Sequence, residues 1–178
     1  MNILVNKFSI LLKYCYGVLI KTQLRSVGIM FYPGYFLHIQ AGHNIEIGSN
    51  FSSNGNVRLY ADSGKIIIGN HNSFNSNVFI GGSDGEIITG DNVLIGPNCV
   101  LRASDHKFRK DQIIRNQGHV SGKIIIEDDV WLGANVVVLK DVIIKKGSII
   151  GAGSVVTKST EEYSINAGVP AKKISERV

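Results

Sequence analysis

Large apolar residues recur along most of this chain with a spacing of six. The spacing is unbroken in the second half, at Ile126, Leu132, Val138, Ile144, Ile150 and Val156. Upstream, the same spacing holds within three shorter runs: Ala41, Ile47, Ser53 and Leu59; Ile68, Phe74 and Ile80; Thr89, Ile95 and Leu101. A period of six fits neither a helix, with about 3.6 residues per turn, nor the alternation of one long strand. It is typical of short strands joined by tight corners, with the repeating residue pointing inward.

A second set of mostly apolar residues lies four positions after the repeating ones. Its members are Phe51, Val57, Val78, Val93, Cys99, Val130, Val136 and Val142. Several repeating residues are followed directly by glycine, which suits a tight corner. Three such strands close one coil of about 18 residues, and stacked coils bury a continuous apolar column. The pattern therefore predicts an all-β chain that forms a parallel β-helix, rather than an ordinary β-sandwich.

The spacing slips at three places, and the slips resemble one another. Two of them, LYADSGKIIIGN and IGGSDGEIITGD, lie 21 residues apart, which is one coil plus three residues. The third begins 21 residues later, at Leu101, and resumes at GKIIIEDD. We expect all three to leave the same corner on consecutive coils. The third is an extended polar loop at 104–121, and it should project one coil above Ser83 and Asp84.

Three segments carry a resemblance to a known family. They read GDNVLIGPNCVLRASDH, DDVWLGANVVVLKDVIIKKGSIIGAGSVVTKS and NAGVPAKKI, and the likeness runs from about Ala41 to Ile174. The pattern resembles the hexapeptide-repeat, left-handed β-helix acyltransferases, and within them the sugar and polysaccharide O-acetyltransferases. The resemblance implies left-handed coils over 29–160, acetyl-CoA as the donor, a sugar or glycan acceptor, and a homotrimer with active sites between subunits. The chain departs from the family pattern at Asp141 and Lys145, where corner glycines are usual.

His106 is the candidate general base. Acetyl transfer from a thioester to a hydroxyl needs a group that accepts the hydroxyl proton, and the pKa of histidine lies near neutrality. His106 stands at the root of the long loop, and the resemblance assigns the catalytic histidine to this position. The sequence leaves the role of His119, at the other root, open. His38 and His43 alone are too few to hold a metal, and no metal is expected.

The resemblance also implies a groove for acetyl-CoA on the later coils. Its contacts would come from Trp131, Ala134, Ala152, Thr157 and Lys158. Trp131 should face outward, because Val130 and Leu132 on either side are inward positions. Packing in a trimer contact would explain an outward tryptophan equally well.

For the acceptor we expect contacts from Asp84, stacked beneath the long loop, and from Asn75 and Asn77. Each also has a purely structural explanation. Asp84 falls in the turn sequence GSDG. Asparagine is favoured at the corners of such coils because it tolerates left-handed backbone angles.

The two ends of the chain lie outside the repeat. Residues 1–28 predict a helical segment ending near Gly28, and residues 161–178 predict a C-terminal tail. The helix would cap the open end of the β-helix, or would make peripheral contact with an anionic membrane. No stretch is long and uncharged enough to cross a bilayer, and no signal peptide is recognisable, so a cytoplasmic protein is expected.

Charge is unevenly placed along the chain. Of the net charge of +5, most falls before the first acidic residue, Glu46. The remainder is nearly neutral, which argues against nucleic acid as a partner.

The predicted activity is acetyl-CoA-dependent O-acetylation of a sugar hydroxyl in surface polysaccharide biosynthesis, by direct attack on the thioester. Three other functions stay open at this point. N-acetylation of a nucleotide-linked amino sugar would use the same base. A metal-dependent hydratase of the carbonic anhydrase type shares the fold but needs three histidines meeting across subunits. A β-helix can also serve as a non-catalytic scaffold.

Overall fold

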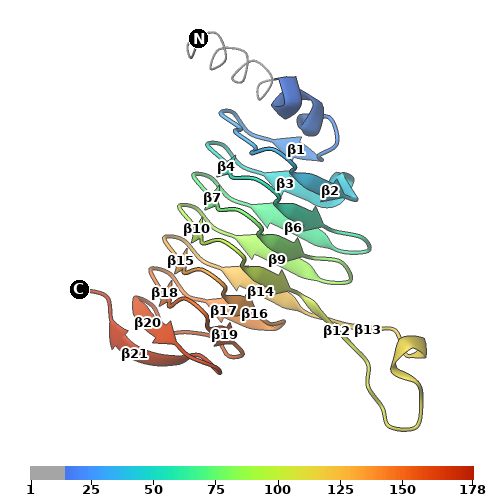
Figure 1. Cartoon of the computed structure of the whole chain (residues 1–178), viewed down its shortest axis with the longest axis vertical. Helices are drawn as coiled ribbons and strands as arrows, with labels where there is room; N and C mark the ends of the chain where they lie inside the picture. Colours follow the sequence, from blue (N-terminus) through green and yellow to red (C-terminus); the bar gives the residue numbers. More distant parts are fainter. Residues whose placement is uncertain (1–14) are drawn as a thin grey trace, which may run out of the picture.

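A computed structural model describes residues 15–178 of the chain. In this part of the molecule, short strands stack into a three-sided column (Figure 1). The first sheet contains β1 (Ser26–Val27), β3 (Ile45–Ile47), β6 (Lys65–Ile68), β9 (Glu86–Thr89), β14 (Lys123–Ile126) and β17 (Val142–Ile144). The second contains β4 (Ser52–Ser53), β7 (Ser73–Phe74), β10 (Leu94–Ile95), β15 (Trp131–Leu132), β18 (Ile149–Ile150), β20 (Ser164–Ala167) and β21 (Lys172–Glu176). The third contains β2 (His38–Gln40), β5 (Arg58–Tyr60), β8 (Phe79–Gly81), β11 (Val100–Arg102), β16 (Val137–Val138) and β19 (Val155–Val156).

The register of the strands confirms a parallel β-helix. Each strand of the column pairs in parallel with the corresponding strand of the next coil. In the third sheet, Leu59 pairs with Ile80 and Ile80 with Leu101, each 21 residues further along the chain. Leu101 then pairs with Val138, 37 residues away, and Val138 with Val156, 18 residues away. The long loop therefore adds residues at one corner and leaves the ladders on either side aligned.

The interior is the apolar column that the spacing predicts. The repeating residues from Ile47 onward are buried, and so is the second set that follows them by four positions. Cys99 is a buried free thiol, and burial raises its pKa. The prediction that Ala41 is an inward residue of the repeat is wrong. The ladder partner of Leu59 is Ile39, and Ala41 lies at a corner with a φ of 55°. The first corner is one residue shorter than the next two, and this shifted the apparent spacing.

The corners are built from residues that tolerate a left-handed backbone. Asn56, Asn77, Asn98 and Asn135 all have φ near 60° at the corner between the second and third sheets. We call this the asparagine corner. Asparagine adopts this conformation at lower cost than most residues, since its short side chain bonds locally.

The corner between the third and first sheets carries all three insertions, as expected, and we call it the loop corner. There the long loop forms a two-stranded antiparallel ribbon of β12 (Ser104–His106) and β13 (His119–Ser121), which projects from the column (Figure 1). Gly85 is required at this corner. A Cβ at residue 85 would overlap the backbone carbonyl of Ala103. Two short 3-10 turns, η1 (Gly42–Asn44) and η2 (Ile114–Asn116), complete the elements.

The two ends differ from expectation in extent. Within the described residues the N-terminal helix covers 15–21 and not a range ending near Gly28; the part of that prediction on residues 1–14 lies outside the description. Ser26 and Val27 form β1, because the Gly28 N–H and its neighbours bond to β3 instead of continuing a helix. The segment predicted as a C-terminal tail forms two strands of the second sheet: β20 pairs with β18, and β21 folds back on β20. No helix of the described chain is long and apolar enough to cross a bilayer.

Candidate active site

The ribbon at the loop corner brings the two root histidines face to face. His106 in β12 and His119 in β13 are directly paired in the antiparallel register. Their ring centroids lie 4.3 Å apart with the planes tilted by 39°. Both residues are exposed. The sequence placed His106 at a rigid root, and the pairing with β13 is what fixes His119 beside it.

Asp84 lies one coil below the ribbon, as the spacing predicts. The Ser104 hydroxyl donates a hydrogen bond to the Ser83 carbonyl over 3.0 Å, which fixes the base of the ribbon on the preceding coil. The Asp84 carboxylate lies 3.3 Å from Nδ1 of His119. Its partner is therefore His119 and not His106. The three side chains form a row in which the carboxylate contacts one imidazole, and that imidazole contacts the next.

A lysine from the following coil reaches the same corner. Lys140 Nζ lies 2.6 Å from the carboxylate of Asp141 and 3.9 Å from that of Asp105. The hydrogen bond between Lys140 and Asp141 raises the pKa of the lysine and lowers that of the aspartate. Asp141 also accepts the Lys123 N–H over 3.2 Å and has a φ of 62°. The aspartate that stands where the family pattern has glycine thus stabilises the corner.

An open groove of about 730 Å³ runs along the loop corner. Its lining carries both signs of charge: Lys65, Glu86 and Lys123 stand side by side in the register of the first sheet, with Lys123 Nζ 3.0 Å from the Glu86 carboxylate, and Asp84 also lines the groove. Such a polar groove suits a ligand rich in hydroxyl groups better than it suits an apolar ligand. Among residues 15–178, no group of three or more histidine, cysteine or acidic side chains is arranged to hold a metal ion.

Gln117 shapes the far part of the loop, and sequence reasoning missed it. Its side-chain amide donates to the carbonyls of Arg109 and Gln112, and its side-chain oxygen accepts the Arg109 N–H over 2.7 Å. These three bonds close the loop on itself. The loop is thus a folded arm with exposed apolar side chains, including Phe108, Ile113 and Ile114. A glutamine in a polar run carries no distinguishing signal in the sequence.

The residues assigned to acetyl-CoA are spread over several sides of the column. Trp131 faces outward as predicted, with 51% of its surface exposed, and lies in β15 of the second sheet. The second sheet is the side opposite the loop corner, so Trp131 and His106 do not meet within one chain. Ala134 and Ala152 lie at the asparagine corner, and Thr157 and Lys158 follow β19 toward the loop corner. Single-chain geometry therefore does not assemble these five positions into one site.

Asn75 and Asn77 belong to the asparagine corner and lie away from His106. Asn77 accepts a hydrogen bond from Asn56 over 2.8 Å and donates one to Asn98 over 3.0 Å. Asn75 accepts one from Asn54 over 3.0 Å. Both amides are thus engaged along the column. The structural explanation for these two residues accounts for every contact they make here.

The comparisons with known proteins agree with the fold. Residues 123–158 match the family model described as bacterial transferase hexapeptide (six repeats). The galactoside O-acetyltransferase of Escherichia coli is 33% identical over 159 residues, which cover 89% of this chain and 66% of that protein. The chain is thus similar to the hexapeptide-repeat transferases, through the repeat at residues 123–158 and along most of its length. Its galactoside O-acetyltransferase relative from Lactococcus lactis is 42% identical over 76 residues, covering 42% of this chain and 36% of the relative.

Solved hexapeptide-repeat structures superpose on most of the column. The N-acyltransferase AntD from Bacillus cereus, in complex with dTDP-4-amino-4,6-dideoxyglucose and coenzyme A, matches with a TM-score of 0.82 at 25% identity. The match covers 90% of this chain and 87% of AntD. A maltose O-acetyltransferase from Clostridium difficile matches with a TM-score of 0.65 at 25% identity, over 90% of this chain and 73% of that one. The matched regions span less than two thirds of the curated relatives' own length, from 22% to 66%.

Proposed function

We propose that this hexapeptide-repeat transferase moves an acetyl group from acetyl-CoA to a hydroxyl of a sugar, in the assembly of a surface polysaccharide. The observation that carries the proposal is the row of Asp84, His119 and His106 at the root of the projecting ribbon. Asp84 of this row lines the open polar groove. An exposed imidazole held on a rigid strand at the end of such a row is suited to take a proton from an acceptor hydroxyl. The family relationship supplies the reaction class.

In the proposed reaction, His106 accepts the proton of the acceptor hydroxyl. The hydroxyl oxygen then attacks the thioester carbonyl, the carbon–sulfur bond breaks, and the sulfur leaves as the thiol of coenzyme A with the proton that His106 returns. The ring of His119 limits the tilt of His106. A histidine base acting in this way would be inactive when protonated, so the rate should fall at acid pH.

We further propose that the active form is a homotrimer with sites between subunits. Support comes from the placement of the family's donor-binding positions. Trp131 faces outward on the second sheet, while His106 lies at the opposite corner. A three-fold ring brings one subunit's loop corner against the next subunit's second or third face, so the two halves of the site can meet only in an assembly. Trp131, Ala134, Ala152, Thr157 and Lys158 would then hold acetyl-CoA, and Asp84 would remain on the acceptor side.

The test is an acceptor screen. The purified full chain is mixed with acetyl-CoA and a panel of glycans, simple sugars and nucleotide sugars, and thiol release is measured together with the mass of each acceptor. Release of thiol with a mass gain of one acetyl group on a sugar hydroxyl supports the proposal. Thiol release that is equal with and without every acceptor would contradict it.

N-acetylation of a nucleotide-linked amino sugar is the second candidate. The likeness to AntD favours it, and so does a dTDP-4-amino-4,6-dideoxy-D-glucose acyltransferase from Escherichia coli, which is 47% identical over 57 residues. These residues cover 32% of this chain and 31% of the relative. The same screen separates the two reactions, because an amide product survives mild alkali whereas an ester is cleaved.

A further inference from the structure

The first coil of the column carries an exposed apolar surface at its N-terminal end. We call it the end patch and define it by Val18, Ile29, Met30, Tyr32, Tyr35 and Phe36. Each of these side chains is exposed. Isolated exposed apolar residues are ordinary, but six of them on one coil and the helix beside it are typical of an interaction surface.

Two members of the end patch stand where the rest of the column has polar residues. Phe36 has a φ of 62° and occupies the first position of the asparagine corner, below Asn56, whose N–H bonds to the carbonyl of Tyr35. At every later coil an asparagine or glycine fills this position: Asn56, Asn77, Asn98, Asn135 and Gly153. A left-handed backbone is unfavourable for a bulky side chain and is an outlier when it occurs. The phenylalanine is therefore present despite a conformational cost, and 69% of its surface is exposed.

The corner between the first and second sheets shows the same exception. Met30, with a φ of 55°, takes the position that later coils fill with Asn50, His71, Asn92, Asp129 and Gly147. It too is more than half exposed. Neither apolar side chain contributes to the buried core. Two corners of the same coil thus carry an exposed apolar residue, at a conformational cost, where later coils carry a polar residue or glycine.

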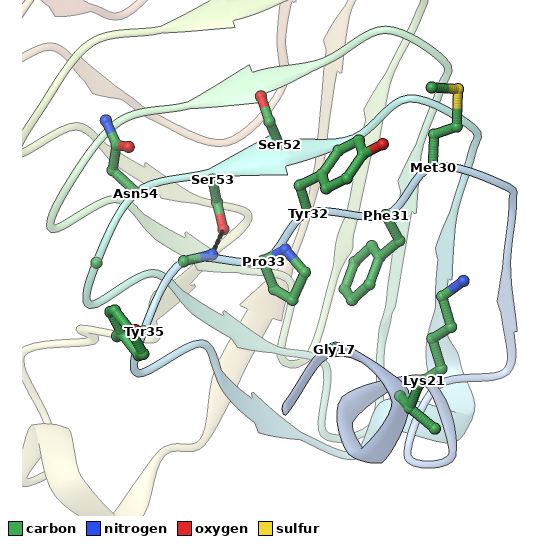
Figure 2. Close-up of a pocket in the computed structure, with 13 residues that line it drawn as sticks. Gly17, Lys21, Met30, Phe31, Tyr32, Pro33, Tyr35, Ser52, Ser53 and Asn54 are labelled. Atoms are coloured by element: carbon green, nitrogen blue, oxygen red, sulfur yellow. Dashed lines mark hydrogen bonds between the residues drawn. The ribbon is translucent and has the colours of Figure 1, made fainter. Parts of the chain in front are cut away.

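The end patch surrounds a hollow of about 730 Å³ between the helix at 15–21 and the first coil. Figure 2 shows Phe31 and Pro33 directed toward the helix that carries Gly17 and Lys21. The Tyr16 hydroxyl donates to the Leu37 carbonyl over 3.1 Å and holds the helix on the coil. Lys21 Nζ lies 5.8 Å from the centroid of the Phe31 ring. The surface therefore combines apolar side chains, tyrosines and a cation at one end of the molecule.

Charge decides which partner fits this surface. Before Glu46 the chain contains Lys7, Lys13, Lys21 and Arg25 and no acidic residue. Glu46 contacts both Arg25 and Lys65, so this small cluster also keeps a net positive charge. Two copies of the chain meeting through this end would bring like charges together. A surface of anionic lipid offers negative charge to Lys21 and an apolar layer to the exposed side chains, and tyrosines favour the boundary between the two.

We propose that the end patch docks the column, N-terminal end first, on a membrane that contains anionic phospholipid. This contact is separate from acetyl transfer at the loop corner. It would keep the long axis of the column upright on the membrane and hold the loop corner at a fixed height above the lipid. An acceptor presented by the membrane would then reach the groove without free diffusion.

The test is co-sedimentation of the full-length protein with vesicles. Phosphatidylcholine vesicles are compared with vesicles of phosphatidylcholine mixed with phosphatidylserine, at low and at high salt. The protein should bind the anionic vesicles, and binding should weaken with salt. Lys21→Gln should weaken it by about fivefold. Absence of binding to anionic vesicles at low salt would overturn the proposal.

The decisive variant carries Met30→Asn together with Phe36→Asn. Asparagine is the residue that the next coil uses at both corners, so the variant should fold and melt at or above the temperature of the original chain. It should lose most vesicle binding and keep its acetyl transfer to a soluble acceptor. Ile174→Asn, which removes an equally exposed apolar side chain from β21, is the control and should bind vesicles unchanged.

Three outcomes contradict the proposal. Equal vesicle binding by the double variant and the original chain would exclude the end patch. A marked fall in its melting temperature would mean that these side chains are covered by another part of the protein. A change of oligomeric state in the double variant, without vesicle binding by the original chain, would assign the end patch to contact between copies.

Discussion

The imidazole rings of His106 and His119 contact one another across the base of the projecting ribbon, with 4.3 Å between their centroids and a tilt of 39° between their planes. The two residues are 13 positions apart in sequence and meet because β12 and β13 pair in register. This contact gives the second histidine a definite place, in line with Asp84, which lies 3.3 Å from it. It also separates two possible effects of mutating the site, loss of the base and loss of its support.

Removing the proposed base should abolish transfer without unfolding the protein. In His106→Ala we expect kcat for acetyl transfer to fall by about a hundredfold to ten-thousandfold, the usual contribution of a positioned base. His106 is exposed and makes no contribution to the core, so the melting temperature should stay within a few degrees. Thiol release from acetyl-CoA and circular dichroism are the measurements. Unchanged release would remove His106 from the role.

His119 should act by supporting His106, and a pair of variants tests this. His119→Phe keeps a ring against His106 but loses the contact with Asp84, whereas His119→Ala loses both. If stacking matters, the phenylalanine variant should retain more kcat than the alanine variant, with similar KM for the acceptor. If the Asp84 contact matters more, Asp84→Asn and both His119 variants should lower kcat to a similar extent. Equal activity in all three variants and the original chain would exclude a supporting role.

Sites shared between subunits predict complementation. His106→Ala and Trp131→Ala should each be weakly active alone, the second through a raised KM for acetyl-CoA. When the two variants are co-expressed, random trimers place an intact His106 beside an intact Trp131 at about a quarter of the sites. Activity should therefore return to roughly that fraction of the original. A mixture no more active than its parts would show that the two residues do not share a site across subunits.

The asparagine corner should govern stability and not acceptor affinity. Asn77→Ala loses two side-chain hydrogen bonds and places alanine at a φ of 61°, so the free energy of unfolding should fall by about 2 kcal/mol. Asn77→Gly loses the same bonds but tolerates the backbone angle, and should lose about half as much. Denaturant melts measure both. A raised acceptor KM with unchanged stability would restore Asn77 to the acceptor site.

Glu127 should contribute stability that disappears in acid. Its carboxylate accepts hydrogen bonds from the Lys145 side chain over 3.0 Å and the Lys146 N–H over 2.9 Å. The bond from Lys145 is the main reason that its pKa lies below the usual value of 4.5. Folding thus favours the ionised form, so this stability is present above that value and is lost as the pH falls through the lowered pKa. Glu127→Gln should melt lower than the original chain near pH 7, and the difference should shrink near pH 3. A difference independent of pH would assign the effect to packing.

How far the sequence predicted the structure depends on whether a feature repeats. The six-residue spacing recurs along most of the chain, so it predicts several features reliably. These are the column, the buried positions from Ile47 onward, the common corner of the three insertions and the outward Trp131. The first coil lacks that redundancy, which is why Ala41 was placed in the core and the helix was extended to Gly28. Pairing with β3 decides the fate of Ser26 and Val27, and this tertiary contact leaves no trace in the local sequence.

The site was predicted in part for the same reason. Asp84 could be placed beneath the loop by counting residues, but its partner depended on the ribbon, whose register only the structure shows. His119 carried no signal of its own until β12 and β13 were paired. Gln117 closes the loop through three side-chain hydrogen bonds, which the polar sequence around it does not predict. Asn75 and Asn77 are polar and outward as expected, yet the column itself uses their amides.

The 37-residue step between Leu101 and Val138 separates two kinds of constraint in this molecule. The ladders above and below the ribbon remain aligned, so the length and composition of residues 107–118 can change without disturbing the packing of any coil or the two histidines at the root. Selection for a new acceptor can therefore act on the arm while the column stays the same. For an engineer, the arm is an exchangeable part: a new segment grafted between His106 and His119 should alter which acceptor is used and leave the melting temperature nearly untouched.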